Sequence, residues 1–252
     1  MVIPLRDENP ALRKPILTIF LIAVNVLIFA LIQPHNDALA EQEFAYRNAV
    51  VPCELSHGQP ISNRLAMVCD PGLGVGSDPE PAYPDKNLLL SVLTAMFLHG
   101  SWLHLLGNML FLWIFGNNVE DRFGRIGYPS FYLVSGIAAT VAHVLTDPNS
   151  INPVVGASGA IAGVMGAYLV LFPHARVLTL IPLFMFLQLV RLKAWVVLAV
   201  WFALQFLTPL GSGVAWVAHV GGFVVGAGIA LVVRLLSPPP PPVVPLLGGL
   251  TD

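Results

Sequence analysis

The chain has 252 residues, of which 56% are hydrophobic and only 10% are Asp, Glu, Lys or Arg, and its formal net charge is −2. A soluble domain carries about 25% charged residues, so a soluble fold of this length could not cover its surface with so few charges. The composition therefore indicates a lipid bilayer as the surrounding medium. The balance of charge excludes a nucleic-acid-binding protein, which would need a clustered basic surface.

Hydropathy predicts an all-α, polytopic membrane protein with six transmembrane helices. The apolar run that begins at Ile16 follows Arg13 and Lys14 as in a signal peptide. It is longer than the usual signal core of about 7–15 residues, so we interpret it as a retained first helix. The helices are expected at about 15–33, 102–117, 127–145, 158–172, 194–207 and 216–236, with a loop or re-entrant piece before the second and an interfacial segment before the fifth.

These helices define the expected domain organisation. A cytoplasmic N-terminal segment (1–13) precedes a six-helix membrane domain (14–236), which contains a long outer loop (34–101). A Pro-rich cytoplasmic tail (237–252) follows, because proline cannot continue a helix.

The distribution of charge predicts the orientation. An even number of helices puts both termini on one side, and that side carries nine of the 12 Lys and Arg residues. The positive-inside rule makes it the cytoplasm, and we expect a bacterial cytoplasmic (inner) membrane. Cys53 and Cys69 then lie in the outer loop, where the sequence is compatible with either a disulfide or two free thiols.

Four polar side chains are predicted to lie at one depth, just below the outer surface. The second, fourth and sixth helices all run inward, and their first turns carry His104 and Asn108, then Ser158, then His219. A polar or ionisable residue at such a depth is expensive, which makes each of these positions a candidate functional site.

Ser158 is the candidate nucleophile and His219 the candidate base. In Gly156-Ala157-Ser158-Gly159 the serine could simply cap a helix, but the flanking glycines permit a tight turn with exposed backbone N–H groups. His219 could instead bond a neighbouring backbone group. Small residues recur at a spacing of four on both helices, which favours close packing that would join the two side chains. They are Ser158, Ala162 and Gly166 on one helix, and Gly222 and Gly226 on the other.

His104 and Asn108 are candidate oxyanion donors. They are four residues apart, lie on one face of a helix, and can both donate hydrogen bonds. His99 is placed at the lip of the same site. A zinc site of His99, His104 and His219 is the metal alternative, but no Cys, Asp or Glu among the apolar helices completes it, so no metal is expected.

Three segments in this order resemble the signature segments of rhomboid proteases. They are His104-Leu-Leu-Gly-Asn108, Gly156-Ala-Ser158-Gly159 and His219-Val-Gly-Gly222, and the turn at 116–122 is similar as well. The resemblance spans about 14–236 and implies an intramembrane serine endopeptidase. Ser158 would be the nucleophile and His219 the base and later the acid. His104, Asn108 and the backbone N–H of Ser158 would hold the oxyanion, and no cofactor is implied.

The resemblance also implies the partners of the protein. Other membrane proteins would be cut within or beside a transmembrane helix near the outer face, with the fifth helix and residues 208–217 gating access. Some family members carry a supporting Tyr four residues after the serine, where this chain has Ala162, so another residue must hold His219. The alternatives are an inactive relative that binds transmembrane helices, and a transporter or channel, which would need polar residues along a path through the membrane.

Overall fold

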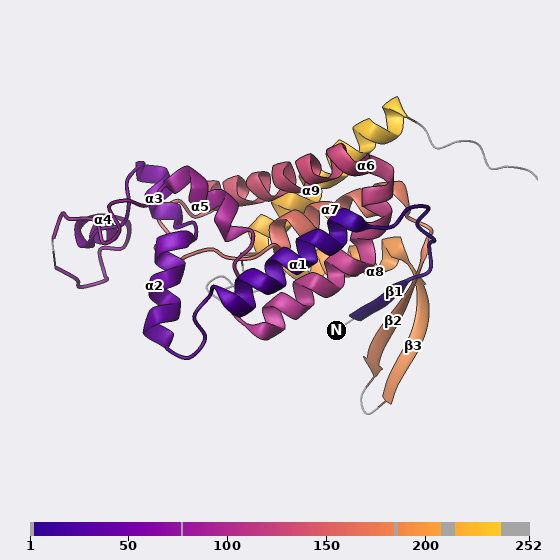
Figure 1. Ribbon diagram of the computed structural model, residues 1–252, viewed down its shortest axis with the longest axis horizontal. Coiled ribbons are helices and arrows are strands. Elements are labelled where there is room, and N and C mark those ends of the chain that lie inside the picture. Colours follow the sequence, from indigo (N-terminus) through magenta and orange to yellow (C-terminus); the bar gives the residue numbers. More distant parts are fainter. Residues whose placement is uncertain (1–2, 77, 184–185, 208–214, 238–252) are drawn as a thin grey trace, which may run out of the picture.

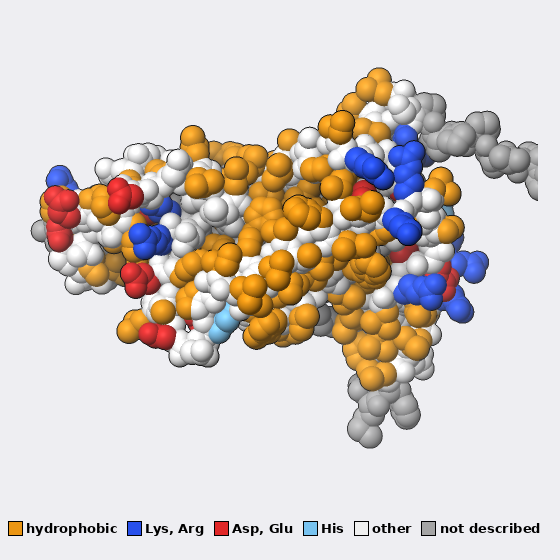
Figure 2. Space-filling model, in the orientation of Figure 1, with side chains coloured by type: hydrophobic (Ala, Val, Ile, Leu, Met, Phe, Trp, Pro, Cys, Tyr) orange, Lys and Arg blue, Asp and Glu red, His pale blue; other side chains and the backbone are white. Residues whose placement is uncertain are grey.

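The computed structural model describes residues 3–76, 78–183, 186–207 and 215–237. A bundle of apolar helices forms the body, with a unit of short helices at one end and a small sheet at the other (Figure 1). Figure 2 shows apolar side chains covering the middle of the bundle and charged side chains gathered at its two ends. This distribution suits a body that lies in a bilayer and ends that lie in water. The expected Pro-rich tail lies outside the described residues, apart from Ser237.

The helices of the bundle lie close to their predicted positions. They are α1 (Ile16–Leu31), α6 (Trp102–Thr146), α7 (Ser158–Leu171), α8 (Ala194–Gln205) and α9 (Trp216–Leu236). By length and composition, α6 and α9 are able to cross a membrane, whereas α1, α7 and α8 are shorter apolar helices. The structure is therefore mostly helical, as expected.

The predicted second and third helices are the two arms of α6. The arms meet at Gly124, whose φ of 74° and ψ of 178° are open to glycine and strongly unfavourable for other residues. The segment between the predicted second and third helices is otherwise helical. Just before the bend, the Glu120 carboxylate accepts hydrogen bonds from the backbone N–H groups of Leu17 (3.0 Å) and Thr18 (2.8 Å). This carboxylate therefore satisfies free donors in the first turn of α1 and joins α1 to α6.

The expected outer loop is largely helical. It contains α2 (Ala38–Asn48), α3 (Pro52–His57), α4 (Asn63–Cys69) and α5 (Leu88–Ala95). Asp37, Ser62 and Asn87 cap α2, α4 and α5 by accepting bonds from backbone N–H groups. The unit has a small apolar core of its own, made of Val51, Cys53, Ile61, Leu65 and Ala66.

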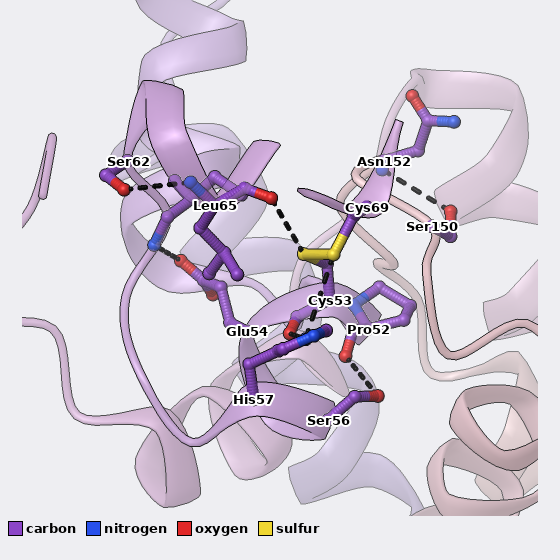
Figure 3. The surroundings of a disulfide bond; sticks show 11 residues. Pro52, Cys53, Glu54, Ser56, His57, Ser62, Leu65, Cys69, Ser150 and Asn152 are labelled. Atoms are coloured by element: carbon purple, nitrogen blue, oxygen red, sulfur yellow. Dashed lines mark hydrogen bonds between the residues drawn. A yellow bond between two sulfur atoms is a disulfide. The ribbon is translucent and has the colours of Figure 1, made fainter. Parts of the chain in front are cut away.

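Two cross-links hold this outer unit together. A disulfide joins Cys53 to Cys69, with the ring of His57 beside it (Figure 3), so the bridge is the correct one of the two alternatives. Glu54 and Lys86 form an ion pair whose side chains are each 1% exposed. Burial raises the pKa of Glu54 and lowers that of Lys86, while their mutual bond acts in the opposite direction.

The outer unit also holds the loop that precedes Ser158. Three backbone hydrogen bonds tie the loop down: Cys53 N–H to the Ser150 carbonyl (3.0 Å), Val154 N–H to the Val50 carbonyl (2.7 Å), and Gly156 N–H to the Ala95 carbonyl (2.9 Å). The short helices outside the bundle therefore position the start of α7.

A three-stranded antiparallel sheet corrects the all-α prediction. Strands β1 (Ile3–Asp7), β2 (Arg176–Leu183) and β3 (Phe186–Lys193) pair in the order β1-β2-β3. The segment before the fifth helix, which was expected to be interfacial, is a hairpin. Pro182 disfavours a helix there, and the β-branched Val177, Thr179 and Val190 favour extended backbone. The predicted cytoplasmic N-terminal segment supplies the third strand.

Helices α7 and α9 pack backbone against backbone. A Cβ atom added at Gly222 would overlap the Gly159 carbonyl, and one added at Gly226 would overlap the Gly163 carbonyl. Gly166 lies equally close to the Phe223 carbonyl. The predicted small-residue stripe therefore has a steric cause: only glycine lets the two helices approach this closely.

Gly226→Ala is expected to separate α7 from α9, and Gly228→Ala is its matched control. Both changes raise helix propensity by about 1 kcal/mol, but a Cβ at Gly228 meets open space. Thermal unfolding in detergent should show a lower midpoint for Gly226→Ala and an unchanged or higher one for Gly228→Ala. Equal midpoints would refute the close contact.

Removing the disulfide is expected to destabilise the outer unit. The bridged cysteines are 16 residues apart, and a cross-link closing such a loop contributes about 3 kcal/mol. The double variant Cys53→Ser/Cys69→Ser should unfold this unit at a lower urea concentration. Limited proteolysis at increasing urea measures that midpoint. A thiol titration of the wild-type protein, denatured without a reductant, should find no free thiols. Free thiols in that titration would contradict the bridge.

Candidate active site

Ser158 and His219 meet where α7 and α9 begin. The Ser158 Oγ atom lies 2.8 Å from Nε2 of His219, and both residues are partly exposed. The helix-cap alternative for Ser158 does not hold, because Ala157 occupies the cap position of α7 and no side chain caps that end. The hydroxyl is directed at the imidazole, as the sequence predicted.

Gly156 shapes the turn into α7 and lies against His104. Its φ is 129°, a conformation that side-chain-bearing residues rarely adopt. A Cβ atom there would lie 2.9 Å from Cε1 and 3.0 Å from Nε2 of His104. Glycine is therefore required twice, by the backbone angle and by the imidazole. Gly159, the other flanking glycine, faces α6, where an added Cβ would meet Ala139.

His104 and Asn108 come from the first turns of α6 and offer donors to the same region. The Gly100 N–H donates to Nδ1 of His104 (3.4 Å), which places the ring hydrogen on Nε2, the atom near Gly156. Asn108 is 8% exposed, and its Nδ2 donates to none of the residues that the structure describes. His104 therefore has an N–H donor at Nε2, and Asn108 has one at Nδ2, that could bind a ligand.

His99 does not lie at the lip of the site. It is 1% exposed, and its ring packs edge-on against His104 with the centroids 5.1 Å apart. Within the described ranges, the one group of three potential metal ligands with adjacent donor atoms is Cys53, His57 and Cys69, whose thiols are joined in the disulfide. The three histidines of the zinc alternative form no such group there.

A cavity of about 800 Å³ adjoins these side chains. Its lining includes His104, Asn108, Ser158, Trp201 and His219, together with the loop at 150–155. These residues, contributed by α6, α7, α8 and α9, therefore border a common space. Residues 208–214, in the segment expected to gate this space, lie outside the described part of the chain.

Gln205 is the residue that the sequence analysis missed. It is the last residue of α8, and its Oε1 lies 2.8 Å from Nδ1 of His219. The Trp201 ring, one turn earlier, lies 6.0 Å from the His219 ring between centroids. The signal was present, because an amide in an otherwise apolar helix meets the criterion that singled out His219. Gln205 supplies the support that Ala162 cannot.

The candidate site is therefore a serine hydroxyl hydrogen-bonded to an imidazole beside a cavity. It lies within a bundle of apolar helices, as expected for a membrane protein. In a comparison with known families, residues 86–235 match the Rhomboid domain. The chain belongs to the rhomboid family.

Several curated relatives carry the same family name. The chain is 35% identical over 144 residues to Rhomboid protein 1, mitochondrial, of Saccharomyces cerevisiae, covering 54% of this chain and 40% of that protein. It is 30% identical over 149 residues to Presenilin-associated rhomboid-like protein A, mitochondrial, of Danio rerio, covering 56% and 37%. The chain thus spans less than half the length of these relatives. Their names are mitochondrial and do not support the expected bacterial inner membrane.

Proposed function

We propose that this protein is an intramembrane serine endopeptidase that cleaves transmembrane segments of other membrane proteins near the outer face of the membrane. The observation that carries the proposal is the 2.8 Å contact between Ser158 Oγ and His219 Nε2 beside the cavity. A serine hydroxyl is a weak nucleophile until a base accepts its proton, and this contact supplies the base.

The proposed reaction is acyl transfer by a dyad. His219 Nε2 takes the proton from Ser158 as Oγ attacks the scissile carbonyl, and the imidazolium then protonates the leaving amine. Water from the cavity then attacks the acyl carbon while His219 accepts its proton. The ester C–O bond breaks, and His219 returns the proton to Ser158 Oγ. No step needs a cofactor.

Three donors are proposed to hold the oxyanion. His104 offers Nε2–H, Asn108 offers its amide, and Ser158 offers its own backbone N–H, which is free because it lies in the first turn of α7. Such fixed donors act most strongly where water is excluded, since the negative charge on the oxygen grows only as the tetrahedral intermediate forms.

The topology proposed for this enzyme has six spans: α1, the two arms of α6, α7, α8 and α9. Lys and Arg gather at the end where α6 bends and the sheet begins (Figure 2). By the positive-inside rule, this distribution supports a cytoplasmic location for that end of the bundle. The disulfide-linked unit then faces the opposite compartment, where oxidising conditions favour the bridge. Ser158, at the same end as this unit, would lie beneath the outer leaflet.

Ser158→Ala tests the proposal directly. The wild-type protein, reconstituted in liposomes with a single-span substrate protein, is expected to cut that substrate. The variant should bind the substrate without cutting it. Its thermal midpoint should match that of the wild type, because the change leaves the fold intact. A fluorophosphonate probe should label the wild-type chain on Ser158, located by mass spectrometry. Equal cleavage by the variant would refute the serine mechanism. Substrate binding without cleavage by both proteins would favour the alternative, an inactive relative that holds transmembrane helices.

Asn108→Ala should lower kcat by about 10²–10³-fold, the usual loss for one oxyanion donor, with little change in KM. Asn152→Ala is the matched control, because Asn152 lines the same cavity but is exposed and lies in the loop before α7. Initial rates over a range of substrate concentrations separate the two parameters. Full activity in Asn108→Ala would remove Asn108 from the proposed site.

A further inference from the structure

Gln205 makes two hydrogen bonds with opposite ends of its side-chain amide. Its Nε2 lies 3.0 Å from the Trp201 carbonyl, one turn earlier in α8, and its Oε1 lies 2.8 Å from Nδ1 of His219. The residue is 8% exposed, so neither end can readily exchange its partner for bulk water. A buried amide with both ends bonded has a single satisfied orientation.

The Trp201 carbonyl decides that orientation. A carbonyl oxygen can only accept, so the NH₂ end of Gln205 must face Trp201, and the oxygen must face His219. An amide oxygen also can only accept, so Nδ1 of His219 must carry the ring hydrogen. The lone pair then lies on Nε2, the nitrogen that faces Ser158 Oγ at 2.8 Å.

We infer that Gln205 is the positioning residue for His219, holding the imidazole in the tautomer that can accept the serine proton. The inference rests on the proposed function. In the opposite tautomer, Nε2 would present an N–H to the serine hydroxyl. Nδ1 of His219 would then be an acceptor facing Oε1 of Gln205, which is also an acceptor. Gln205 thus occupies the place that a carboxylate holds in a Ser–His–Asp triad, but without a charge.

A neutral amide suits this place in an apolar bundle. A carboxylate between α8 and α9 would carry a large desolvation penalty, whereas an amide needs only its two hydrogen bonds. After proton transfer, the Gln205 oxygen continues to accept from Nδ1–H. This hydrogen bond stabilises the imidazolium and keeps the ring from rotating. Trp201 restricts the same ring from one side, with an interplanar angle of 40°.

The kinetic test compares Gln205→Leu with Gln205→Glu in the full chain. The leucine cannot accept a hydrogen bond, so kcat should fall at least about tenfold, towards the ~10⁴-fold loss known for an inverted tautomer, while KM stays within about twofold. The glutamate still offers an oxygen to Nδ1–H and should recover part of kcat, but less than the native amide, because a buried carboxylate is costly. Gln188→Leu, at an exposed glutamine in β3, is the matched control and should behave as wild type.

The structural test is nitrogen NMR of protein labelled at its seven histidines, with His219 assigned by loss of its signals in His219→Asn. Wild type should show the Nδ1–H tautomer, and Gln205→Leu should show Nε2–H or a mixture. Unchanged tautomer and unchanged kcat in a folded Gln205→Leu protein would overturn the inference and leave the protease intact. A tautomer change in a chain that cleaves no substrate would support the inference and refute the protease.

Discussion

The close contact between α7 and α9 is the constraint on which the site depends. A serine hydroxyl reaches barely beyond its own backbone, so an imidazole on another helix can meet it only if the two backbones nearly touch. Gly222 and Gly226 of α9 lie against the carbonyls of Gly159 and Gly163, which leaves no room for a side chain. This packing holds Ser158 Oγ 2.8 Å from His219 without any loop to adjust the distance.

The parts outside the bundle serve that contact indirectly. Backbone bonds from the outer unit hold the loop before Ser158, and the disulfide and the buried Glu54–Lys86 pair make that unit rigid. Gly156 then turns the chain so that its backbone passes beside His104. The start of α7 is thus fixed from two sides, by α9 within the bundle and by short helices beyond it. This rigidity suits a site whose donors must be in place before charge develops.

Several polar groups within the bundle meet at the candidate site, where most of them have specific partners in apolar surroundings. Ser158, His219 and Gln205 form a chain of hydrogen bonds that crosses α7, α9 and α8. His104 and Asn108 line the cavity beside Ser158. The polarity of a side chain in an apolar helix identified four of these five residues from sequence, whereas Gln205, near the end of the predicted fifth helix, was missed.

Hydropathy and spacing alone predicted the apolar helices to within a few residues, the glycine stripe, and four residues that the structure brings to the candidate site, because these depend on local patterns of period and polarity. The hairpin at 176–193 was missed, since a short apolar run with one proline fits a strand or an interfacial segment equally well until a partner strand is known. Likewise, the outer loop gave no sign that its helices would pack on the chain before Ser158. The choice of bridge over free thiols, the burial of His99 and the support of His219 by Gln205 were decided by tertiary structure, because each is a contact between segments far apart in the chain.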